Sequence, residues 1–123
     1  MKTKGELEAE ISAAVIRFKR EYMGRGPQEV RTYLIDDLVV VRLKGVLTPA
    51  EQRLAKLEDP HRGRDLIKQL RIELIEHGRD ILEASVSGIL AVGIRSLHSD
   101  ISTKTGESLI VFTLERRPDM KAD

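Results

Sequence analysis

The sequence contains no cysteine and few aromatic residues. Without cysteine the chain has no disulfides, thiolate metal ligands or cysteine nucleophile, and this absence fits a reducing cytoplasm. Aromatic side chains make up 3% of the residues, too few for the stacking platforms that bind single-stranded nucleic acid. A Gly-x-x-Gly loop between two helices is also missing. An RNA-binding domain is therefore a weak alternative, resting on element order alone.

The chain also lacks an excess of charge. Its 21 Lys and Arg residues oppose 20 Asp and Glu residues, which leaves a net charge of +1. This balance provides no overall field that would steer the chain to nucleic acid or to an anionic membrane. We therefore expect no nucleic-acid partner.

Long hydrophobic runs are absent as well. The most apolar windows, residues 38–47 and 89–94, are far shorter than the ~20 residues that cross a bilayer. Residues 1–6 lead into a charged amphipathic stretch, so we expect no signal peptide. We expect a cytoplasmic protein without a membrane span, which could reach a membrane only through a partner.

The composition that remains is typical of one ordered domain. The chain has 123 residues, of which 33% are charged and 41% hydrophobic. This length can bury one core but not two. We expect a single domain over residues 1–115 and a polar C-terminal tail over residues 116–123 that frays.

The first half of the chain predicts a helix followed by a hairpin. Apolar residues recur at spacings of three and four from Leu7 to Tyr22, and the helix should stop at Gly24-Arg25-Gly26-Pro27. Residues 30–44 form two β-rich runs that meet at Asp36-Asp37. A two-residue turn there gives one apolar face and one half-apolar face, which indicates a partner surface. The half-apolar face carries Arg31, Tyr33, Ile35, Leu38, Val40 and Arg42.

The middle of the chain predicts a short helix and a long one. Thr48-Pro49-Ala50-Glu51 has the residues of a helix start, and this helix should run to about Leu57. After a break at residues 59–63, helical periodicity continues to about Gly88. Such a helix spans ~40 Å, about twice an average strand. Part of it should overhang the sheet and pack against a second subunit, so we expect a homo-oligomer, with a dimer the first choice.

A second hairpin should pair residues 93–101 with 108–115 around the turn Thr103-Lys104-Thr105-Gly106. That turn contains residues of phosphate-binding loops, but their order is wrong and no helix follows the glycine. The predicted element order is α-β-β-α-α-β-β. It indicates an α+β fold in which a four-stranded, mainly antiparallel sheet packs against helices on one face.

The run from Ser96 to Glu107 sets polar side chains between two apolar strands. Strand alternation places His98 and Asp100 on the outward side with Ser96, and Leu97 and Ser99 on the core side. Three interpretations compete for His98 and Asp100. They could contribute two ligands to a metal site, act as a catalytic dyad beside a serine, or form a polar pair on a face that is solvated or covered by another subunit. We favour the polar pair, because a third ligand and an oxyanion loop are not evident.

Gly24-Arg25-Gly26-Pro27 has two interpretations. It is first a helix stop, but a guanidinium in a flexible loop could also hold a small anion such as phosphate or bicarbonate. For a small-anion or nucleotide binding module, the residues to test are Arg25, Arg42 and His98, with Asp100 beside them. No catalytic residue, cofactor or metal is expected.

Four segments together resemble a family of small bacterial proteins known as the MpsC subunit of a Na+-translocating, membrane-potential-generating system. They are YMGRGP at 22–27, VRLKGVLTPAE at 41–51, Gly63-Arg64, and SLHSDISTKTGE at 96–107. The resemblance implies a small soluble protein that is accessory to membrane proteins of ion or inorganic-carbon uptake. It transfers no catalytic residues. The leading hypothesis is thus a non-enzymatic accessory or regulatory protein with a membrane-protein partner.

Overall fold

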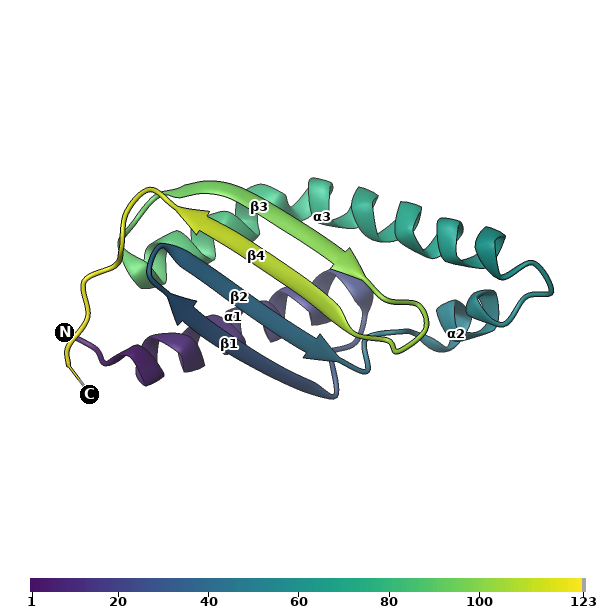
Figure 1. Ribbon diagram of the computed structural model, residues 1–123, viewed down its shortest axis with the longest axis horizontal. Helices are drawn as coiled ribbons and strands as arrows, with labels where there is room; N and C mark the ends of the chain where they lie inside the picture. Colours follow the sequence, from purple (N-terminus) through teal and green to yellow (C-terminus); the bar gives the residue numbers. More distant parts are fainter. Residues whose placement is uncertain (123) are drawn as a thin grey trace.

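The computed structural model describes residues 1–122 and has the predicted order of elements (Figure 1). Three helices alternate with two hairpins. The elements are α1 (Lys4–Met23), β1 (Glu29–Ile35), β2 (Leu38–Lys44), α2 (Pro49–Ala55), α3 (Pro60–Leu90), β3 (Ile94–Ile101) and β4 (Ser108–Leu114). The protein therefore has the expected α+β fold.

The two hairpins join into one antiparallel sheet of four strands in the order β1-β2-β4-β3. The registers that follow from the two predicted turns, at Asp36-Asp37 and at residues 103–106, are confirmed. Leu34 lies opposite Val39 in the first hairpin, and His98 lies opposite Val111 in the second. The hairpins meet along β2 and β4, where Val40 pairs with Val111. Because β2 and β3 are both antiparallel to β4, they run parallel to each other, and the segment with α2 and α3 is the long crossover connection that joins them.

Helices α1 and α3 cover one face of this sheet, and Figure 1 shows both behind the strands. Alternate strand residues turn toward these helices and meet the apolar stripes of α1 and α3. The completely buried side chains of this core include Ile11, Val15, Val39, Val41, Leu43, Ile67, Leu82, Val86, Ile110 and Phe112. The apolar face predicted for the first hairpin is thus the face that packs on the helices.

The helix ends follow from local chemistry. Thr3 and Thr48 each form a capping box with the glutamate three residues later, which satisfies backbone N–H groups at the starts of α1 and α2. Helix α1 stops at Gly24, whose φ of 78° lies in the left-handed region that glycine adopts without strain. Helix α2 ends at Ala55, two residues before the predicted end.

Helix α3 is continuous and overhangs the sheet, as predicted. Its 31 residues span about 46 Å, whereas the eight residues of β3 span about 27 Å. In Figure 1 the N-terminal part of α3 extends past the strands, with α2 on the same side. Leu66, Leu70 and Ile81 remain exposed along this helix.

Two predictions are wrong in detail. Ser99 turns to the helix side of β3, as its parity requires, but it is exposed because β3 is an edge strand. The described part of the tail, residues 116–122, packs against the rest of the chain, whereas fraying was predicted. Pro118 is buried, Met120 packs against the core, and the Lys121 N–H donates to the Lys2 carbonyl at 2.8 Å. Apolar contact and a backbone hydrogen bond to the N-terminal segment hold this part of the tail.

Candidate functional site

The sheet face opposite the helices is uncovered, and we call it the open face. Three of its apolar side chains are strongly exposed, namely Tyr33 at 40%, Ile35 at 53% and Leu109 at 41%. Three further apolar side chains there are half-buried: Leu38, Val40 and Val111. An apolar centre of this kind is typical of interaction surfaces. The half-apolar face predicted from the first hairpin is therefore real and continues onto β4.

Arg42, His98 and Asp100, predicted from the sequence, share this open face. Arg42 and Asp100 flank Leu109 in one row across the sheet, about 10 Å apart at two strand spacings. The Arg42 guanidinium donates to Glu107 at 2.7 Å, and this hydrogen bond raises its pKa. The three residues thus lie on one surface without converging on a common point.

His98 and Asp100 do not form the polar pair expected of them. His98 Nε2 lies 3.3 Å from Ser96 Oγ, which also hydrogen-bonds to Thr113. Asp100 Oδ1 instead accepts from the Ile101 N–H at 2.8 Å and from Lys68 Nζ at 3.1 Å. These hydrogen bonds lower the pKa of Asp100, and the one from the Ile101 N–H has the larger effect. The reason is that β3 is an edge strand, where an Asp side chain can reach across to α3.

This arrangement gives no support to the two chemical alternatives. A catalytic dyad needs a hydrogen bond between the Asp100 carboxylate and the His98 ring, but this carboxylate forms an ion pair with Lys68 instead. Within residues 1–122 no three His, Asp or Glu side chains are grouped closely enough to hold a metal ion.

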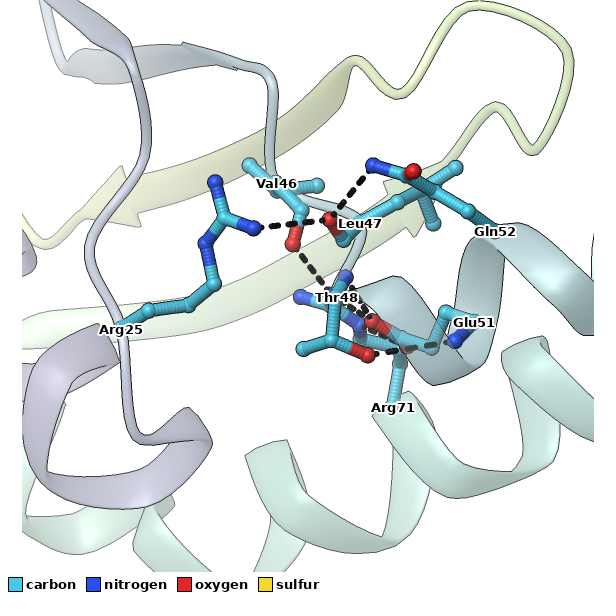
Figure 2. Close-up of polar contacts among 7 residues, drawn as sticks. All are labelled: Arg25, Val46, Leu47, Thr48, Glu51, Gln52 and Arg71. Carbon is cyan, nitrogen blue, oxygen red and sulfur yellow. Dashed lines mark hydrogen bonds and ion pairs between the residues drawn. The ribbon is translucent and has the colours of Figure 1, made fainter.

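Arg25 lies away from the open face, in the loop between α1 and β1. Its Nη1 donates to the Leu47 carbonyl at 3.3 Å, and Gln52 Nε2 donates to the same oxygen at 3.3 Å (Figure 2). Arg25 thus fastens its loop to the segment that leads into α2. The structure does not bring Arg25 together with Arg42, His98 and Asp100.

Next to this loop lies a buried ion pair that the sequence analysis missed. Arg71 of α3 donates to both carboxylate oxygens of Glu51, from Nε at 2.8 Å and from Nη2 at 2.6 Å, and also to the Val46 carbonyl at 2.8 Å (Figure 2). Both side chains are buried. Burial disfavours the charged form of Glu51, but the hydrogen bonds from Arg71 and Thr48 outweigh it and lower the pKa of Glu51.

A second cation, Lys19 of α1, belongs to the same cluster. Burial and the neighbouring positive charge of Arg71 lower the pKa of Lys19 to about 8, against the opposing effect of Glu51. The cluster of Lys19, Glu51 and Arg71 therefore holds two cationic side chains and one carboxylate.

The sequence did contain a signal for this cluster. Arg71 lies four residues after Ile67 and four before Ile75, on the buried stripe of α3, and Lys19 lies four after the buried Val15. A charged residue in the apolar phase of a helix points inward and needs a partner. The sequence pattern assigned Glu51 to helix capping alone, although its carboxylate both caps α2 and pairs with Arg71.

The family model described as "Na+-translocating membrane potential-generating system (MpsC)" matches residues 3–116. The protein named "Uncharacterized protein YbcI" from Bacillus subtilis (strain 168) is 39% identical over 113 residues, covering 92% of this chain and 89% of that protein. "Uncharacterized protein YrhF" from the same organism is 24% identical over 112 residues, covering 89% and 88%. No solved structure matches.

The chain belongs to the MpsC family, and the expected resemblance is confirmed. The family description concerns a membrane system, whereas none of the helices in residues 1–122 is long and apolar enough to span a membrane.

Proposed function

We propose that this protein is a non-enzymatic accessory component of a membrane ion-translocating system and that it binds a membrane-protein partner through the open face. Membership of the MpsC family supports the link to such a system. The observation that carries the proposal is the uncovered apolar centre of the sheet, around Tyr33, Ile35 and Leu109.

The surroundings of this centre support a protein partner. Ion pairs border it at one end of the strands, between Arg42 and Glu107 and between Lys44 and Glu29. An apolar centre beside charged groups is the usual anatomy of a reversible protein interface. The partner would cover the apolar side chains, and the charged border would set its orientation. The absence of cysteine fits a site of action in the cytoplasm, at the membrane surface.

The long helix supports self-association as part of this function. Leu66, Leu70, Leu74 and Ile81 follow one another at spacings of four and seven along α3, and three of them are strongly exposed. Such spacing forms a continuous apolar stripe that a second helix can cover. The proposed assembly is a dimer through α3, which leaves the open face free for the membrane partner.

Site-specific crosslinking tests the proposal. A photoreactive amino acid at position 33, on the open face, should crosslink to an integral membrane protein when the full chain is incubated with membranes of the native host. Leu109→Glu should abolish this crosslink, since a carboxylate would be placed in the apolar centre. The matched control, Ala13→Glu, lies on the exposed side of α1 and should leave it intact.

Crosslinks that survive Leu109→Glu would contradict the proposed docking face. Recovery of soluble proteins alone, without an integral membrane protein, would contradict the membrane-accessory role.

A further inference from the structure

Lys19 is a charged side chain without a counter-ion. It is 4% exposed, and within residues 1–122 it forms neither a hydrogen bond nor an ion pair. The three carboxylates of this region are engaged by other cations, since Glu51 binds Arg71, Asp100 binds Lys68 and Glu76 binds Arg79. Burying an ammonium group in this way costs several kcal/mol of solvation, so its position needs an explanation.

Lys19 lines a cavity of about 120 Å³ between α3 and β3. Arg71 and Lys68 add positive charge to the wall, opposed by Glu76 and Asp100, and the serines at 99 and 108 add hydroxyl groups. The remaining wall is apolar and consists of Ile72, Ile75, Leu97 and Ile101. An apolar wall lowers the local dielectric and strengthens the attraction between Lys19 and any anion that enters.

The cavity adjoins a larger basic groove. This groove, of about 670 Å³, shares Lys68, Asp100 and Ile101 with the cavity. Its outer part carries His61, Arg64 and Lys104, and its remaining acid, Glu107, is paired with Arg42. Three full positive charges, on Arg64, Lys68 and Lys104, exceed the two carboxylates of Asp100 and Glu107, and a cleft with an excess of positive charge raises the local concentration of anions. Positive side chains therefore lead from solvent toward the buried ammonium.

We propose that this cavity binds a small oxyanion, with the Lys19 ammonium as its counter-charge and the Ser99 hydroxyl as a hydrogen-bond donor, since the Ser108 hydroxyl already donates to the Asp100 carbonyl. A cavity of about 150 Å³ holds a benzene ring, so this one admits an oxyanion of about four or five heavy atoms. The cavity lies at the β3 edge of the sheet, where Asp100 belongs both to its wall and to the open face, and binding there does not depend on a membrane partner. It also differs from the anion site first predicted at Arg25, Arg42 and His98.

Amide NMR titration of the full chain tests this proposal. Sodium phosphate, bicarbonate and acetate are added in turn, against sodium chloride at equal ionic strength. At least one oxyanion should shift the amide signals of Leu97, Ser99 and Ser108 with saturation in the millimolar range. Lys19→Met should weaken this binding at least about tenfold, whereas Lys4→Met, on the exposed first turn of α1, should leave it unchanged.

Lys19→Met keeps the unbranched stem of the side chain to within one atom and removes the unpaired charge, so the variant should fold. Its amide spectrum without added anion checks this directly. The proposal is overturned if none of the three oxyanions binds the unmodified protein, or if binding is equal in Lys19→Met. Ser99→Ala gives a second test, because this exposed side chain does not pack in the core. The substitution should weaken oxyanion binding a few-fold.

Discussion

A Cβ atom placed on Gly63 would lie 1.8 Å from the backbone carbonyl oxygen of Leu54. The start of α3 therefore touches the main chain of α2 directly, and only a residue without a side chain fits there. This contact fixes α2 against the overhanging part of α3. It thereby positions Glu51, on α2, against Arg71, on α3.

Gly63→Ala should destabilise the protein by about 2 kcal/mol or more, because backbone atoms cannot move aside as a flexible side chain can. Urea unfolding followed by circular dichroism measures the effect. Gly88→Ala is the matched control in the same helix, where an added Cβ meets nothing within 4 Å. That control should stabilise the protein by about 0.5–1 kcal/mol through helix propensity. Equal effects of the two substitutions would contradict the α2–α3 contact.

Glu51→Gln should destabilise the protein by about 3–5 kcal/mol, because it leaves the Arg71 guanidinium buried without its carboxylate. Glutamine still completes the capping box, so the loss reports the ion pair and not the helix start. Glu21→Gln, at an exposed position of α1, is the control and should change stability by less than about 0.5 kcal/mol. A loss for Glu51→Gln no larger than the control would show that the pair is not formed.

Lys19→Met should stabilise the protein at neutral pH. The pKa of Lys19 falls from 10.5 to about 8 on folding, which corresponds to about 3 kcal/mol of unfavourable energy for the charged form at pH 7. Because the unfolded chain binds more protons than the folded chain between pH 8 and 10.5, this penalty shrinks as pH rises through that window.

The advantage of Lys19→Met over the unmodified protein should therefore be largest below pH 8 and should fade by pH 10.5. Urea unfolding in buffers free of oxyanions measures it. Lys4→Met, whose lysine is exposed, should show neither the stabilisation nor the pH trend. An advantage independent of pH would mean that Lys19 is not a buried charge.

Light scattering tests the association through α3. The unmodified protein should be a dimer, and Leu70→Glu should convert it to a monomer, because a carboxylate would be placed in the apolar stripe. Arg17→Glu, at an exposed position of α1, is the control; it changes the net charge more than Leu70→Glu does and should leave the dimer intact. A monomer at high concentration in the unmodified protein would remove the oligomeric part of the proposal.

Local sequence signals predicted most of the fold. Leu7, Ile11 and Val15 keep one helical face apolar, and Thr48 with Glu51 marks a helix start that the structure reproduces. The Asp36-Asp37 turn fixed the register of the first hairpin, since a turn of known length determines which residues face each other. These features depend on contacts between residues close in the chain.

The candidate site could be predicted only in part. The alternation of side chains along a strand placed His98 and Asp100 on the outward side of β3. In the structure His98 contacts Ser96, whereas Asp100 pairs with Lys68. Lys68 is 32 residues away from Asp100, and no local rule relates the two. A pairing across such a distance depends on how α3 crosses the edge of the sheet.

The sequence by itself thus determined the elements, their order and which strand faces are apolar, because periodicity and capping act within a few residues. Only the tertiary structure decided that β2 pairs with β4, that Glu51 meets Arg71, and that Lys19 is enclosed without a counter-ion. The physical reason is burial. A charge next to an apolar stripe becomes costly, and chemically informative, only when other elements close over it and remove the water.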